Sequence, residues 1–144
     1  MKTQILAIAG AVILSTFMAG ECRAQSRTIE ATVPFAFEVG DKTMPAGNYR
    51  IESIATGAGS LQVIRSAKGD LQVTLSAIAV PAKNANSGPE LIFHRYGTHY
   101  FLAQIQTGGG HGRQLFESQQ EKKLAHSEAM NEIALLIRVP AERP

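Results

Sequence analysis

The sequence predicts a mostly β fold: a single antiparallel β-sandwich or barrel-like domain with one short helix near the C-terminus. Apolar and polar residues alternate with a period of two over several short runs, as they do in half-buried strands. Glycine and proline separate these runs at fairly regular spacing, which is typical of all-β domains. A single segment, after residue 117, has the composition and the start signal of a helix.

The strands of the first half are predicted by this alternation. Residues 28–33 place Ile29, Ala31 and Val33 on one face, and Pro34 ends the run because proline has no amide proton to donate. The further strands expected in this half are 35–39, 48–54, 61–66 and 70–80, with turns at 40–42, 44–47 and 67–69.

A second hairpin is predicted beyond the middle of the chain. Residues 90–95 and 98–107 flank the Tyr96-Gly97 pair, which suits a two-residue turn. The polar stretch 81–89 before this hairpin and the glycine-rich stretch 108–112 after it are expected to be loops.

The single helix is predicted by its start signal. Ser118 and Glu121 match a capping box, in which the serine accepts the amide of the glutamate and the glutamate reaches back. A helix is therefore expected over about residues 119–126. The following segment either continues this helix or forms a strand. The compact, partly β-branched run 133–139, closed by Pro140, favours a strand.

The first 24 residues have the layout of a secretory signal peptide. Lys2 provides a positive start, residues 5–18 are almost wholly apolar, and Ala24 and Cys22 stand at positions −1 and −3 of a cleavage site. The apolar run is shorter than the roughly 20 residues of a membrane span. We therefore expect export to the periplasm or the cell exterior and a mature single domain of residues 25–144, with no transmembrane segment.

Cys22 allows a second interpretation, lipidation as in bacterial lipoproteins. That motif requires a small residue before the cysteine, and the charged Glu21 fits it poorly. An uncleaved anchor is a third interpretation, against which the polar residues Arg23, Gln25 and Ser26 argue. Cleavage after Ala24 would leave a mature chain without cysteine and hence without a disulfide.

The charge balance of the chain excludes one class of partner. Removing Lys2, Arg23 and Glu21 with the signal leaves 12 of the 14 basic and 11 of the 12 acidic residues, a net charge of +1. The basic residues are scattered, whereas nucleic-acid binders cluster them on one face. We therefore expect no nucleic-acid partner.

One segment resembles a known family. Residues 33–49 read V-P-F-A-F-E-V-G-D-K-T-M-P-A-G-N-Y. They resemble the opening V-P-F-x-F-x-V-G-x-K-x-L-P-A-G-x-Y of a family of small, uncharacterised secreted bacterial proteins, with Met44 in place of leucine. Residues 93–97 and 100–102 are similar to the central hairpin of that family. The resemblance implies a secreted β domain and no particular activity, cofactor or site residue.

The histidines are the candidate metal ligands. A two-residue turn at Tyr96-Gly97 would place His94 and His99 directly opposite each other on neighbouring strands, about 5 Å apart. His111, on the glycine-rich loop, could supply the third ligand of a zinc site. A shift of one residue in register would instead place His94 and His99 on opposite faces as ordinary surface residues.

The sequence leaves two other kinds of site open, a binding platform and a hydrolytic site. Arg95, Tyr96 and Tyr100 bracket the hairpin tip and could form a platform for a sugar or peptide, although Tyr100 also suits the core. A hydrolase is the weakest alternative. The chain has no G-x-S-x-G motif, so a serine–histidine–acid triad could only assemble in space.

The sequence as a whole favours a secreted, non-enzymatic domain with a structural or binding role at or outside the cell envelope. We expect no cofactor, and a partner such as an envelope glycan or protein. The expected contact regions are the loop 83–88, the hairpin tip at Tyr96 and the glycine loop. The alternatives are a small metal-binding protein using His94, His99 and His111, and a small hydrolase.

Overall fold

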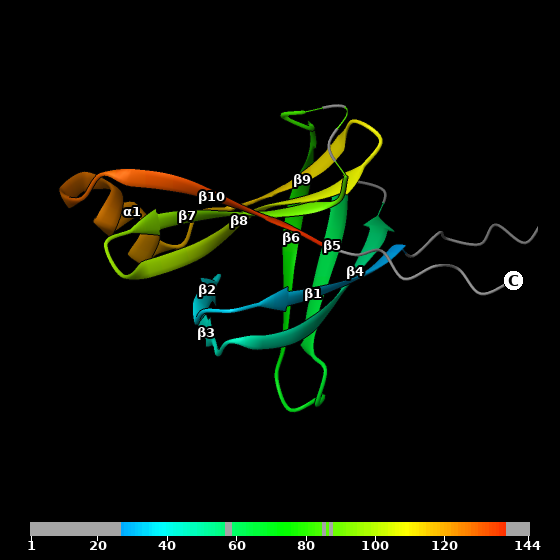
Figure 1. The fold of residues 1–144 in the computed structure, drawn as a ribbon, viewed down its shortest axis with the longest axis horizontal. Coiled ribbons are helices and arrows are strands. Elements are labelled where there is room, and N and C mark those ends of the chain that lie inside the picture. Colours follow the sequence, from blue (N-terminus) through cyan, green and yellow to red (C-terminus); the bar gives the residue numbers. More distant parts are fainter. Residues whose placement is uncertain (1–26, 57–58, 85, 87, 138–144) are drawn as a thin grey trace, which may run out of the picture.

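The computed structural model describes residues 27–56, 59–84, 86 and 88–137 (Figure 1). The predicted signal peptide, its cleavage site, Cys22 and the last two residues of the predicted strand 133–139 lie outside these residues. Within the described part of the chain, no helix combines the length and the hydropathy needed to cross a membrane.

Ten strands and one helix make up the described residues, and one of the strands falls where a turn was expected. The strands are β1 (Arg27–Val33), β2 (Phe37–Val39), β3 (Lys42–Met44), β4 (Gly47–Thr56), β5 (Gly59–Ser66), β6 (Gln72–Pro81), β7 (Glu90–Tyr96), β8 (His99–Gly108), β9 (His111–Leu115) and β10 (Met130–Leu136), with α1 (Gln119–Ser127) between the last two. The prediction of a mostly β fold with one short helix is confirmed.

All ten strands join in one open sheet. Its main path runs β1-β4-β5-β6-β9-β8, and β8 continues through β7 to β10. The short β2 lies along the first part of β8, pairing Glu38 with Phe101, and β3 pairs with β2. The β2–β8 pair is parallel, so the prediction of a purely antiparallel sheet is wrong at this point. β9 covers that edge of β8 only from Gln104 onward, which leaves the edge beside Phe101 open for β2.

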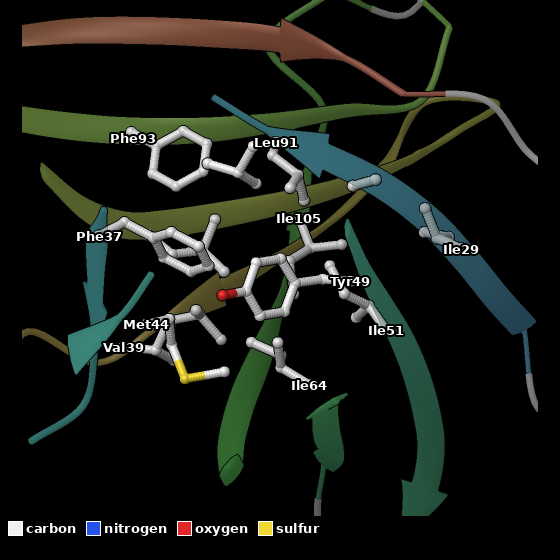
Figure 2. Close-up of a cluster of buried hydrophobic side chains, with 14 of the residues drawn as sticks. Ile29, Phe37, Val39, Met44, Tyr49, Ile51, Ile64, Leu91, Phe93 and Ile105 are labelled. Atoms are coloured by element: carbon white, nitrogen blue, oxygen red, sulfur yellow. The ribbon is translucent and has the colours of Figure 1, made fainter. Parts of the chain in front are cut away.

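The core lies between the two halves of the sheet. Figure 2 shows side chains from β1 and β4 pointing toward those of β7 and β8, with β2 and β3 closing one end. Phe37 packs edge-on against Tyr49 and Phe93, with ring centroids 5.2 and 5.5 Å apart. The predicted inward face of β1 is confirmed, because Ile29, Ala31 and Val33 are all buried.

Two strands, β3 and β9, were not predicted from the sequence. β3 falls where a turn was expected, and its Met44 is only 1% exposed because it enters the core. β9 follows a turn of three glycines with positive φ and pairs with both β6 and β8. β3 pairs only with the preceding β2, whereas β9 pairs with the preceding β8 and also with β6, which lies much earlier in the chain.

The turn of the β7–β8 hairpin also differs from the prediction. Tyr96 pairs with His99, so the turn is Gly97-Thr98 and not Tyr96-Gly97. Gly97 has a φ of +59°, which glycine adopts without the strain that a β-carbon brings. The strand after the helix is confirmed, but β10 begins at Met130, three residues before the predicted start.

The other face of β7 and β8 carries the helix. Phe93 and Leu102 point into the core, so His94, Tyr96 and Phe101 face the opposite side. Figure 1 shows α1 at the end of β7 and β10, where it covers this side. Its residue Glu121 is 3% exposed, which places a carboxylate between the helix and the sheet.

Candidate functional site

A buried carboxylate–imidazole pair lies under the helix. Nδ1 of His94 on β7 is 2.8 Å from Oε1 of Glu121 on α1. The Glu121 side chain is 4% exposed and that of His94 is 21% exposed, so solvent reaches the pair from the histidine side. The short distance fits an Nδ1–H of His94 that donates to the carboxylate.

The start of the helix explains why Glu121 points inward. The hydroxyl of Ser118 accepts the Glu121 amide at 3.1 Å, as the predicted capping box requires. The glutamate carboxylate is directed to the sheet, where it meets His94 and Tyr96. The N-cap hydrogen bond of the helix is therefore confirmed, and the carboxylate of the same glutamate contacts side chains of β7.

Glu117 and Tyr96 complete the surroundings of this pair. One ligand atom each from His94, Glu117 and Glu121 lie within 4.8 Å of one another, and Glu117 is exposed. The Tyr96 hydroxyl donates to Oε1 of Glu121 at 3.5 Å. Burial raises the pKa of Tyr96 above 10, and the negative charges of Glu121 and Glu117 raise it further. We call His94, Glu117 and Glu121 the His94 cluster.

The structure separates the three histidines that the sequence grouped. His99 pairs with Tyr96 and is diagonal to His94, not opposite it, because the turn lies one residue later than predicted. Its Nδ1 is 3.9 Å from Oε2 of Glu38 on β2. His111 pairs with Gly108 at the far end of β8. Gly108 is seven residues, or about 23 Å of extended strand, from the residue opposite His94.

The structure also separates the residues of the predicted binding platform at the hairpin tip. Tyr96 is 3% exposed and faces the helix, whereas Arg95 and Tyr100 face the other side of the sheet, because successive strand residues alternate. The Arg95 guanidinium lies 5.6 Å above the ring of Tyr100, and that ring stacks on Phe35 at 4.0 Å. Arg95 and Tyr100 thus form a stack with Phe35, without Tyr96.

The described residues also form a groove of about 670 Å³ between β1 and the end of β10. It was not foreseen from the sequence, since its residues come from four strands and one turn. The lining residues are Glu30, Ala31, Thr32, Asn48, Tyr49, Arg50, Arg65, Ser66, Ala67, Lys68, Gly69, Leu136 and Ile137. We call this the β1–β10 groove.

Positive charge exceeds negative charge in the β1–β10 groove. The sheet register places Glu30 opposite Arg50, and Arg50 opposite Arg65. Arg50 forms an ion pair with Glu30 at 2.9 Å, while Nε of Arg65 donates to the neutral amide of Gln72 at 3.0 Å. Lys68 in the following turn adds a third cation. These residues are scattered in the sequence, and only the strand register brings them together.

The His94–Glu121 pair resembles the base half of a hydrolytic triad, which needs a hydroxyl or thiol on the histidine. Among the described residues, no serine, threonine or cysteine is hydrogen-bonded to His94. The hydroxyl of Tyr96 donates to Glu121, and that of Ser118 accepts the Glu121 amide, so both of these hydroxyls are bonded to Glu121. The described residues therefore include no hydroxyl or thiol that is hydrogen-bonded to His94.

Comparisons with protein-family models, with curated proteins and with solved structures found no match. The β1–β10 groove and the His94 cluster are therefore interpreted from their own geometry.

Proposed function

We propose that this chain is an exported, non-enzymatic binding domain that holds an extended acidic peptide segment of a partner protein in the β1–β10 groove. One observation carries the proposal: three cationic side chains, from β4, β5 and the turn after β5, line the same groove as β1, whose outer edge has no partner among the described residues. The partner would be a protein of the cell envelope or of the exterior.

The edge of β1 supplies backbone recognition. β1 is hydrogen-bonded to β4 alone among the described strands, and β10 at the other end of the sheet is bonded to β7 alone. An exposed strand edge pairs readily with an extended peptide through main-chain hydrogen bonds. We infer a barrel-like sheet with an open seam between β1 and β10, where such a peptide would fit as an added strand.

The charges of the groove select an acidic peptide. Arg50 and Arg65 are directly opposite each other, and like charges in that position are unfavourable. Glu30 compensates only one of them. A carboxylate of the ligand placed between Arg65 and Lys68 would relieve the remaining repulsion and form charge-assisted hydrogen bonds.

The end of β10 supplies an apolar contact. Leu136 lines the groove and is 79% exposed, so its side chain is accessible to an apolar residue of a ligand. In an added strand, side chains alternate between two faces. A ligand that alternates acidic and apolar residues would therefore meet the cations on one face and Leu136 on the other.

The test is a binding titration with a defined probe. The probe is a peptide of alternating glutamate and valine, about the length of β1. We expect saturable binding that weakens with added salt and falls at least about tenfold in Arg65→Gln and Lys68→Gln, which each remove a cation. Lys122→Gln, on the exposed side of α1, is the matched control and should bind normally.

A second probe separates strand addition from simple charge attraction. The same peptide, methylated on every backbone nitrogen, keeps its charges but loses all of its ladder donors. The proposal requires that this peptide no longer binds. Equal binding of both peptides, or stronger binding of an anionic polysaccharide, would contradict the peptide assignment.

Export has its own test. The mass of the protein recovered from its secretory route should correspond to residues 25–144. A mass that includes a lipid on Cys22, or the whole first segment, would contradict the proposed cleavage after Ala24.

A further inference from the structure

We propose that the His94 cluster is a zinc site, with His94, Glu117 and Glu121 as its protein ligands and water in the fourth position. This site is independent of the β1–β10 groove. Glu132 of β10 is paired with His94 of β7. Leu136, which lines the groove, lies four residues further along β10, or about 13 Å of extended strand.

The burial of Glu121 is the first argument for a cation. A carboxylate that is 4% exposed needs a charged or strongly hydrogen-bonding partner. Among the described residues, no lysine or arginine forms an ion pair with Glu121, and its partners are His94 and Tyr96. The helix thus buries a negative group with only an imidazole to balance it.

Glu117 makes the imbalance larger. It brings a second carboxylate within 4.8 Å of the same atoms, so two negative charges face one imidazole. A divalent cation with two carboxylates and a neutral imidazole is an electrically neutral set.

The donor atoms suit zinc. Zinc binds imidazole nitrogen and carboxylate oxygen at about 2 Å and, in open sites, takes three protein ligands and a water. Tetrahedral ligands at that distance lie about 3.3 Å apart. His94 and Glu121 are already closer than this, and a carboxylate oxygen of the exposed Glu117 lies within 4.8 Å of both.

The test is calorimetric titration of the chelator-treated protein with zinc chloride. We expect one zinc ion per chain, binding at least about tenfold weaker in Glu117→Gln and His94→Gln. Glu117→Gln is the decisive variant because its side chain is exposed, so its thermal unfolding without metal should match that of the unsubstituted protein.

Three controls define the site. Glu128→Gln makes the same change at the other end of the helix, on an exposed residue, and should leave zinc binding unaltered. His99→Gln and His111→Gln should also bind normally. The inference is overturned if zinc does not bind stoichiometrically or if Glu117→Gln binds as tightly as the unsubstituted protein. Loss of binding in His111→Gln would overturn it as well.

Discussion

At the scale of the residue, Glu121 and Tyr96 are electrostatically coupled. The Tyr96 pKa is raised by burial first and by Glu121 and Glu117 second. Glu121→Gln removes one negative charge and keeps the burial, so the Tyr96 pKa should fall but remain above its ordinary value of 10.0. Ultraviolet titration of tyrosinate, assigned with Tyr96→Phe, measures this change. An unaltered Tyr96 pKa would show that Glu121 does not face the phenol.

Two tyrosines, Tyr49 and Tyr96, make the stability of the protein depend on pH in the alkaline range. Burial raises the pKa of both Tyr49 and Tyr96 in the folded protein, so the native state keeps protons that the unfolded chain releases. The free energy of unfolding is therefore unaffected by these groups below pH 10 and decreases as the pH rises through the raised native pKa values. Urea unfolding across this range should show the decrease, and Tyr96→Phe should make it smaller.

At the scale of the element, the β7–β8 hairpin depends on Gly97. Its φ is +59°, and a β-carbon there would also lie 2.6 Å from the Glu128 carboxylate. Gly97→Ala should lower the free energy of unfolding by about 1 kcal/mol through the backbone conformation, since the flexible carboxylate can move away. Gly47→Ala is the control in open space, and urea unfolding compares the two. Equal stabilities would contradict the turn assignment.

The helix depends on its N-cap. Ser118→Ala removes the acceptor of the Glu121 amide and should destabilise the protein by about 1 kcal/mol, measured by thermal or urea unfolding. Ser127→Ala, at the exposed end of the same helix, is the matched control and should have little effect. If both variants lose the same stability, the cap has no special role.

Elements with a strong local pattern were predictable from the sequence, and two short strands were not. Alternation gave the inward face of β1, and the cap gave the start of α1, because both signals lie within a few residues. β3 and β9 are short, so neither has enough alternating residues to be recognised, and of the two only β9 pairs with a strand far away in the sequence, β6. The turn was predicted one residue too early. The observed turn at Gly97-Thr98 places Tyr96, and not His94, opposite His99.

The two candidate sites, the His94 cluster and the β1–β10 groove, were also predictable only where the signal is local in the sequence. His94 was singled out from the sequence, but its carboxylate partners come from a helix whose docking onto β7 has no local signal. The β1–β10 groove was not anticipated, because Arg50, Arg65 and Lys68 are spread over two strands and a turn. Only the register of β4 and β5 places the two arginines opposite each other.

At the scale of the whole molecule, the open sheet leaves three strands, β1, β3 and β10, with one unpaired edge each among the described residues, and residues of β1 and the end of β10 both line the groove. Proteins usually protect such edges with charge or with a covering segment. In the proposed function, the cations of the groove would repel another cationic surface and attract an acidic strand. The central claim is therefore that the groove takes up one extended acidic segment as an added strand.

Amide hydrogen exchange of β1, with and without the alternating glutamate–valine peptide, tests this claim most directly. Strand addition predicts that the β1 amides not bonded to β4 exchange more slowly when the peptide is bound. The Arg65→Gln variant should lose that protection at the same peptide concentration. Binding that leaves β1 exchange unaltered, or that protects only another part of the sheet, would contradict the account.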